Sequence, residues 1–302
     1  MVNILISGYY GFDNIGDESI LRTLVSSLRE HIPDCSLTVL SHNPASTREK
    51  YGVEAVDRMS PMAILRAVKG CDMLISGGGS LLQDVTSSKS LHYYLAIIRC
   101  AEFFHKKVFI YSQGIGPIDR PGNRRAAAKA LQRADGIVVR DERSAALLEE
   151  IGIARDKVVI TADPVIRMKK PDGDVGADIL HKAGVTLDGR LTVGWAIREK
   201  DKDGRFVAEI LKSIRWLKEK YNAQSVLIPF HYEEDGEVCR HIASQLPDDT
   251  AVCLNEKYLS EDMLSIIGNM DMLVGVRLHS LIYAAIMGVP LIGISYDPKC
   301  TA

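Results

Sequence analysis

The sequence predicts an α/β fold with two successive doubly wound parallel sheets, and three observations indicate it. Short apolar runs that do not alternate with polar residues are each followed by a stretch of helical periodicity. Polar, glycine-rich loops recur where these strands end, and a polar stretch separates two such series. We therefore expect two Rossmann-like domains, at 1–167 and 191–302, joined by a linker at 168–190 and facing each other across a cleft.

Composition and charge narrow the class of function. The 302-residue chain is 46% hydrophobic and 25% charged, as expected of a soluble globular protein. Its net charge of -2 disfavours a general nucleic-acid binder, so no nucleic-acid partner is expected. No apolar run is long enough to span a bilayer and the N-terminus enters a strand pattern directly, which predicts the cytoplasm as the compartment. The six cysteines are scattered without a CxxC pair, so neither a disulfide framework nor a metal site is expected.

The N-terminal series opens with an apolar strand at 2–6, which runs into a glycine-rich loop and a helix that ends at Pro33. The loop spacing is not GxGxxG, so a dinucleotide cofactor is not indicated. Its polar residues Asp13, Asn14 and Asp17 are groups that bind sugar hydroxyls. The alternative is that Asp17 only caps the helix.

Two further glycine-rich loops follow strands in this series. A strand at 71–76 leads into three consecutive glycines, Gly77 to Gly79, and a strand at 108–112 leads into Gln113 and Gly114. Glycine weakens a regular element, so such a run indicates close approach of the backbone to a ligand or to the facing domain. The same alternation predicts strands at 37–41, 53–56 and 136–139, and helices after 61, at 88–105 and after 144.

A basic stretch at 120–133 surrounds an alanine-rich helical segment. Its weak apolar side favours a solvated helix face over contact with an anionic membrane surface or a lipid diphosphate. Short Asp-x-Asp patterns, at 172–174 and 201–203, match the metal-binding pattern of some glycosyltransferases. Both lie in polar, loop-like sequence, which favours solvated turns.

The C-terminal series predicts strands at 191–196 and 225–229 and helices near 234–246 and 261–268. An apolar strand at 272–276 then precedes a small-residue helix that stops at Gly288 and Pro290. After a strand at 291–295 the chain stops without a closing helix, so we expect that a C-terminal closing segment is absent.

Arg277 and His279 fall between the strand at 272–276 and the helix after it. Ligands of open α/β sheets bind at the carboxyl ends of strands, so a guanidinium and an imidazole there predict an anionic substrate and a proton transfer. Arg140 occupies the corresponding position in the N-terminal series. The alternative is that Arg277 pairs with a nearby carboxylate and His279 merely caps the helix.

Five motifs lie at the predicted strand ends: Gly-Phe-Asp-Asn-Ile-Gly-Asp-Glu at 11–18, Gly-Gly-Gly-Ser at 77–80, Ser-Gln-Gly-Ile-Gly-Pro at 112–117, Val-Arg-Asp-Glu-Arg-Ser at 139–144 and Gly-Val-Arg-Leu-His-Ser at 275–280. They occur together, in the same order, in the polysaccharide pyruvyl transferases, which this chain resembles over nearly its whole length. The similarity is greatest to the bacterial cell-wall branch of that family, called CsaB, and the two-domain layout resembles that of GT-B glycosyltransferases.

The resemblance implies transfer of a pyruvyl group from phosphoenolpyruvate to two hydroxyls of one sugar, which forms a cyclic ketal. In the bacterial branch the sugar is an N-acetylmannosamine residue of a lipid-diphosphate-linked cell-wall polymer precursor. Peripheral contact with the inner face of the plasma membrane follows from such an acceptor, and phosphoenolpyruvate is a substrate, so no cofactor is expected. The family pattern places phosphoenolpyruvate on the residues matching Arg140, Arg277, Leu278, His279 and Lys299.

The residue types suit these roles. Arginine binds carboxylate and phosphate with two parallel hydrogen bonds, and histidine can donate a proton near neutral pH. We therefore expect His279, Arg140 and Arg277 to be catalytic. The acceptor sugar is expected on Asp13, Asn14, Asp17, Gly78, Gly79 and Gln113. Two alternatives remain open: a glycosyltransferase that uses a nucleotide sugar, and a sugar-binding module without catalysis.

Overall fold

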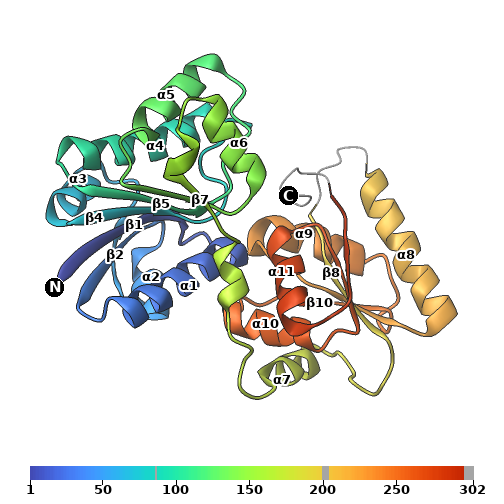
Figure 1. The fold of residues 1–302 in the computed structure, drawn as a ribbon. Coiled ribbons are helices and arrows are strands. Elements are labelled where there is room, and N and C mark those ends of the chain that lie inside the picture. Colours follow the sequence, from blue (N-terminus) through green and yellow to red (C-terminus); the bar gives the residue numbers. More distant parts are fainter. Residues whose placement is uncertain (86, 199–203, 296–302) are drawn as a thin grey trace. The chain divides into compact units, whose positions relative to one another are not determined.

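A computed structural model describes residues 1–85, 87–198 and 204–295 of the chain (Figure 1). The chain forms two compact units. Of the described residues, unit 1 comprises Met1–Phe12 and Asp17–Val165, and unit 2 comprises Asp13–Gly16 and those from Ile166 to Ser295. Each unit is an α/β domain with its own parallel sheet, which confirms the predicted fold class.

Unit 1 contains a seven-stranded sheet in the order β3-β2-β1-β4-β5-β6-β7. The order runs outward in both directions from β1 and β4, so the neighbouring carboxyl ends of these two strands are the switch point where open α/β sheets bind ligands. The strands are β1 Val2–Tyr10, β2 Cys35–Ser41, β3 Glu54–Asp57, β4 Met73–Gly77, β5 Lys107–Gln113, β6 Gly136–Val139 and β7 Val158–Ile160.

Both faces of this sheet are buried. Along β1, Ile4 and Ile6 pack in one apolar cluster and Leu5 packs in another, because successive side chains of a strand point to opposite faces. This explains why the strands read as continuous apolar runs. The covering helices are α1 Ile15–His31, α2 Pro44–Tyr51, α3 Pro61–Gly70, α4 Ser88–Phe103, α5 Pro121–Leu131 and α6 Glu142–Glu150, with 3-10 turns η1 Arg155–Lys157 and η2 Pro164–Arg167.

Unit 2 contains a five-stranded sheet in the order β10-β9-β8-β11-β12, and all of its described pairs are parallel. Its strands are β8 Thr192–Ala196, β9 Gln224–Leu227, β10 Ala251–Cys253, β11 Met272–Gly275 and β12 Leu291–Gly293. Its helices are α7 Val175–Lys182, α8 Arg205–Tyr221, α9 Tyr232–Ala243, α10 Ser260–Gly268 and α11 Leu278–Met287.

The segment 168–190, expected to be a linker, contains helix α7 and lies in unit 2. Gly176 of α7 packs directly on the backbone of Ser265 in α10, where a side chain would overlap it, and its N–H donates to Ser265 Oγ at 2.9 Å. Asp174 caps α7 by accepting from Ala177 N at 3.1 Å and also accepts from the Asn269 amide at 2.6 Å. The polar sequence therefore reflects a capped surface helix, and Asp174 of the first Asp-x-Asp pattern is its cap.

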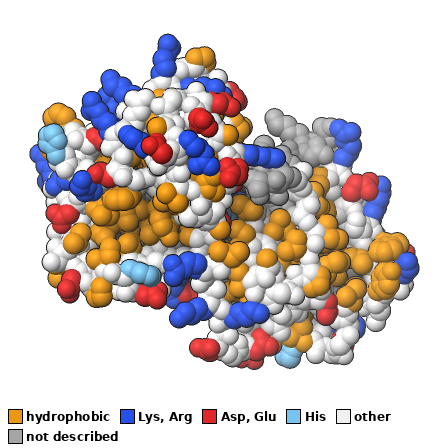
Figure 2. Space-filling view, viewed as in Figure 1, with side chains coloured by type: hydrophobic (Ala, Val, Ile, Leu, Met, Phe, Trp, Pro, Cys, Tyr) orange, Lys and Arg blue, Asp and Glu red, His pale blue; other side chains and the backbone are white. Residues whose placement is uncertain are grey.

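Among the helices of the described residues, none is long and apolar enough to cross a membrane. In the view of Figure 2, apolar side chains gather over a broad area of unit 1, and lysines and arginines are spread around its edge. Arg125, Lys129 and Arg133 of the predicted basic stretch are exposed, in agreement with a solvated helix face.

Candidate functional site

The loops that follow β4 and β5 lie against each other at the carboxyl edge of unit 1. Gly114 N donates to Gly79 O at 3.0 Å. Gly78 and Gly79 have positive φ angles of 97° and 58°, a conformation that favours glycine. A side chain on Gly79 would come within 2.7 Å of Asp17 Oδ1. The structure thus brings Asp17, Gly78, Gly79 and the Gln113 loop together.

Gln113 itself is fully buried. Its amide nitrogen donates to Ser76 O at 2.7 Å and to Ser76 Oγ at 3.0 Å, so Gln113 ties the end of β5 to β4. Asp17 lies in the first turn of α1, not at its N-cap. The capping alternative is therefore not what the structure shows.

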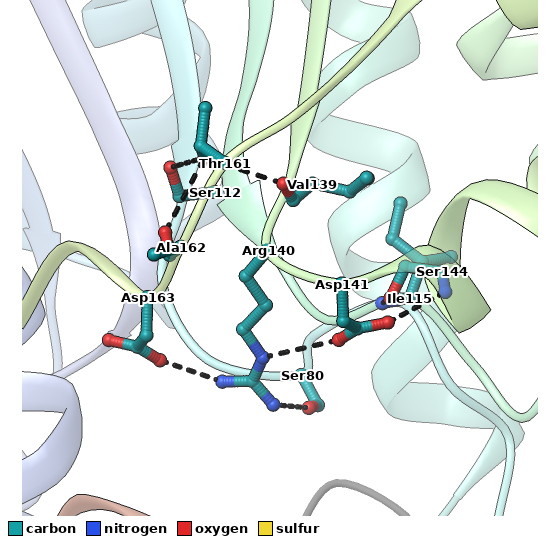
Figure 3. Close-up of polar contacts among 10 residues, drawn as sticks. All are labelled: Ser80, Ser112, Ile115, Val139, Arg140, Asp141, Ser144, Thr161, Ala162 and Asp163. Atoms are coloured by element: carbon teal, nitrogen blue, oxygen red, sulfur yellow. Dashed lines mark hydrogen bonds and ion pairs between the residues drawn. The ribbon is translucent and has the colours of Figure 1, made fainter. Parts of the chain in front are cut away.

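Arg140, which follows β6, is nearly buried and is held by groups from several loops (Figure 3). Its Nη1 donates to Asp163 Oδ2 at 2.9 Å and its Nη2 donates to Ser80 Oγ at 3.2 Å. Its Nε lies 3.7 Å from Asp141 Oδ2, while Asp141 Oδ1 caps α6 by accepting from Ser144 N at 2.7 Å. Asp163 and Asp141 fix the guanidinium on two sides.

Gly114 makes room for Arg140. A Cβ atom at this position would lie 2.7 Å from Nη2 and 2.8 Å from Nε of the guanidinium. Only glycine allows the guanidinium to lie directly on the backbone there. This is a physical reason for the first glycine of the Gln-Gly-Ile-Gly motif.

Asp13 and Asn14 belong to unit 2. The Asp13 carboxylate accepts from Lys257 Nζ at 2.6 Å, and this hydrogen bond raises the pKa of the Lys257 ammonium group. Asn14 Oδ1 accepts from Gly16 N at 3.1 Å, and Asn14 forms an isolated antiparallel bridge with His231. These contacts hold the loop to the end of β9, so the predicted acceptor residues divide between the two units.

Arg277 is the N-cap residue of α11, directly beyond β11. Its guanidinium makes a two-pronged ion pair with Asp235, in which Nε donates to Oδ2 at 3.0 Å and Nη2 donates to Oδ1. Asp235 is fully buried, and its Oδ2 also accepts from Phe230 N at 3.2 Å and His231 N at 2.8 Å. The structure therefore contains the carboxylate partner that was the alternative interpretation of Arg277. It also shows a guanidinium held in one orientation.

His279 lies two residues on, in the first turn of α11 after Leu278. Its ring packs against Gly16, where a Cβ atom would overlap the imidazole. Ser280 Oγ donates to Arg277 O at 2.6 Å, so Ser280 closes the turn. Gly16 thus has the same relation to His279 that Gly114 has to Arg140.

The structure brings Arg277, Leu278 and His279 together in one turn of unit 2, and places Arg140 in unit 1. Lys299 lies outside the described residues, as do Asp201 and Asp203. In the described part of the chain no group of three His, Cys, Asp or Glu side chains is arranged to hold a metal ion.

Sequence reasoning missed the acidic partners Asp163, Asp235 and Glu234, and also Arg198. Asp163 and Arg198 lie shortly beyond the ends of β7 and β8, as the predicted site residues lie beyond their strands, whereas Glu234 and Asp235 lie in the first turn of α9. The position after a strand is the signal that would have identified Asp163 and Arg198.

Comparison with known proteins places the chain in a family and a fold. Residues 14–298 match the family described as polysaccharide pyruvyl transferase. The amylovoran biosynthesis protein AmsJ of Erwinia amylovora is 21% identical, over 99% of this chain and 84% of that protein.

Solved structures of UDP-GlcNAc 2-epimerases share the fold. The enzyme from Methanocaldococcus jannaschii has a TM-score of 0.68 and 13% identity, over 99% of this chain and 86% of that one. The enzyme from Neisseria meningitidis, bound to UDP-GlcNAc, has a TM-score of 0.65 and 13% identity, over 100% and 85%. Identity this low shows the fold alone, whereas the family match spans nearly the whole sequence and the motifs described above. The chain belongs to the polysaccharide pyruvyl transferase family.

Proposed function

We propose that the chain transfers a pyruvyl group from phosphoenolpyruvate to two hydroxyls of one sugar and releases phosphate. The chain belongs to a pyruvyl transferase family, and the observation that supports the proposal most directly is the structure of the turn after β11. It presents a guanidinium fixed by Asp235 and, two residues on, the His279 imidazole. A fixed cation suits an anionic donor, and an imidazole suits proton transfer near neutral pH.

In the proposed reaction, a sugar hydroxyl adds to C2 of phosphoenolpyruvate and gives its proton to the phosphate group, while His279 protonates C3. The C2–O bond to phosphate then breaks, and hydrogen phosphate leaves with the bonding electrons. The resulting oxocarbenium-like centre is captured by the second hydroxyl, whose proton returns to His279 as the ketal closes. Arg277, Leu278 and Lys299 are proposed to bind the donor, with Arg140 as a further donor-binding cation.

We propose as acceptor an N-acetylmannosamine residue in a lipid-diphosphate-linked cell-wall polysaccharide precursor, as in the CsaB branch. The sugar would be bound by Asp13, Asn14, Asp17, Gly78, Gly79 and Gln113. Such an acceptor would bring the enzyme to the cytoplasmic face of the plasma membrane.

The test is to incubate the chain with phosphoenolpyruvate and an N-acetylmannosamine-containing lipid-diphosphate disaccharide. We expect phosphate release in proportion to a glycan product that has gained one pyruvyl ketal by mass spectrometry. A thermal-shift series with phosphoenolpyruvate, UDP-GlcNAc and the free disaccharide separates the alternatives, because stabilisation grows with ligand concentration over its dissociation constant. A shift with UDP-GlcNAc and none with phosphoenolpyruvate would overturn the proposal in favour of nucleotide-sugar chemistry.

A further inference from the structure

Two arginines of unit 2 stand at equivalent positions on neighbouring strands. In the parallel pair of β8 and β11, Ala196 is the register partner of Gly275. Arg198 lies two residues beyond Ala196, and Arg277 lies two residues beyond Gly275. Val276 N also donates to Ala196 O at 2.9 Å, so the pairing continues toward the arginines. Both therefore leave the carboxyl edge of the sheet side by side.

One carboxylate oxygen lies against both guanidinium groups. Glu234 Oε2 is 3.1 Å from Arg198 Nη2 and 3.5 Å from Arg277 Nη2. The Glu234 side chain is 52% exposed and that of Arg198 is 30% exposed. An exposed ion pair of this kind contributes little to stability, so displacement of its carboxylate by another anion costs little free energy.

Asp235, the next residue, differs in each of these respects. It is buried, it holds Arg277 through both oxygens, and it is itself fixed by two backbone N–H groups. Removal of Asp235 would take away the buried carboxylate that faces a nearly buried guanidinium, which is costly. Asp235 is thus a permanent support for Arg277, whereas Glu234 is a partner that another anion can replace.

We propose that Arg198 and Arg277 form a clamp for one oxyanion of the ligand, and that Glu234 occupies the place of that oxyanion in the free chain. Resting on the proposed function, this assigns the clamp to the phosphate group of phosphoenolpyruvate. Two guanidinium groups on one oxygen suit a phosphate, which carries more negative charge than a carboxylate and offers oxygens to both.

The clamp predicts that substitution of Arg198 and substitution of Glu234 change the affinity for phosphoenolpyruvate in opposite directions. By calorimetry with phosphoenolpyruvate, Arg198→Gln should weaken binding roughly tenfold, because it removes a charge-assisted contact. Glu234→Gln should tighten binding roughly two- to fivefold, because it removes an exposed competing carboxylate. Glu237→Gln is the matched control: it changes the net charge equally, lies one turn further along α9 and is exposed, so affinity should stay the same.

Titrations with inorganic phosphate and with pyruvate identify the group that is clamped. Phosphate affinity should follow the phosphoenolpyruvate series, and pyruvate affinity should not. Arg198→Lys, which keeps the charge, should bind with intermediate affinity and guards against a misfolded Gln variant. Unchanged affinity in both Arg198 variants, weaker binding in Glu234→Gln, or an effect on pyruvate alone would overturn the clamp.

The clamp and the proposed function fail separately. If the variants shift phosphate binding in opposite directions but the chain transfers no pyruvyl group, the clamp stands and the reaction does not. If pyruvyl transfer occurs and Arg198→Gln leaves the KM for phosphoenolpyruvate unchanged, the reaction stands and the clamp is wrong.

Discussion

The surroundings of Arg140 in unit 1 and of Arg277 in unit 2 differ in how each fixes a guanidinium. Arg140 is held by Asp163, Asp141 and Ser80, each through a different nitrogen. Arg277 is held chiefly through a two-pronged ion pair with Asp235, which is fully buried. Arg140 is fixed by side chains from three separate segments of unit 1. Arg277 is fixed mainly by one carboxylate in the first turn of α9.

The charged side chains that contact the two arginines also differ. Arg140 faces two carboxylates, Asp163 and Asp141, whereas Arg277 faces Asp235 and Glu234, and Glu234 also pairs with Arg198. Displacement of Glu234 would leave Arg198 and Arg277 with one named carboxylate, Asp235, beside them. Coulomb attraction for an anion is therefore expected to be stronger there than at Arg140. This favours unit 2 as the main site for an anionic donor.

The largest effect is expected from removal of the carboxylate that supports each arginine. Asp235→Ala should lower the free energy of unfolding of unit 2 by about 3–5 kcal/mol, because it removes the buried carboxylate that both fixes the guanidinium and accepts from two backbone N–H groups. Asp163→Ala should destabilise unit 1 by roughly 1–3 kcal/mol, since Ser80 and Asp141 still contact Arg140.

Both tryptophans of the chain, Trp195 and Trp216, lie in unit 2, so their fluorescence during denaturant unfolding reports on that unit. Asp235→Ala should move this transition, and Asp163→Ala should leave it in place. Equal shifts in both variants would mean that the two environments do not differ as described.

The next effect concerns the division of work within the turn after β11. His279→Gln keeps a polar side chain but cannot supply the proton, so turnover should fall at least about a hundredfold with little change in the KM for phosphoenolpyruvate. Arg277→Lys keeps the charge but loses the two-pronged geometry, so donor affinity should fall. Steady-state kinetics of both variants test this. Near-normal turnover in His279→Gln would reduce His279 to a donor-binding residue.

A smaller effect is expected from Gly114→Ala, which adds a side chain where the Arg140 guanidinium packs on the backbone. Gly114→Ala would place a Cβ atom 2.7 Å from Arg140 Nη2, so the guanidinium must move, at a cost of about 1–3 kcal/mol. Gly122→Ala in α5 is the control, because nothing lies within 4 Å of the added atom. Far-UV circular dichroism during unfolding should show destabilisation in the first variant only. A neutral Gly114→Ala would show that the contact with Arg140 imposes no constraint.

The smallest effect should come from Asp13→Ala. It removes an exposed pair with Lys257, worth about 0.2–1 kcal/mol, and should weaken acceptor use while phosphoenolpyruvate binding remains nearly intact. Because Asp13 raises the pKa of Lys257, the stabilisation is fully present below the ordinary lysine pKa of about 10.4 and disappears as pH rises through the raised value. Denaturation of both proteins at neutral and strongly alkaline pH measures the difference. Lost phosphoenolpyruvate binding in Asp13→Ala, by calorimetry, would contradict the assignment to the acceptor.

The sequence by itself determined the fold class, most of the strands and helices, and the placement of Arg140, Arg277 and His279 at strand ends, but it did not predict α2, β7 or β10. Apolar runs without alternation specify strands buried on both faces, and glycines with polar neighbours mark the loops beyond them. The same local signals misjudged residues 168–190. A short polar helix on the surface has the composition of a linker until its partner, α10, is known.

Only the tertiary structure decided which side chains surround the arginines. Asp235 is 42 positions from Arg277, and Ser80 is 60 positions from Arg140. Arg198 stands beside Arg277 because β8 pairs with β11, although β9 and β10 lie between them in the sequence. Parallel strands joined through helices bring together residues that are far apart in the chain, and local sequence carries no record of that register. The partners of Arg277, and with them the proposed clamp, therefore follow from strand pairing.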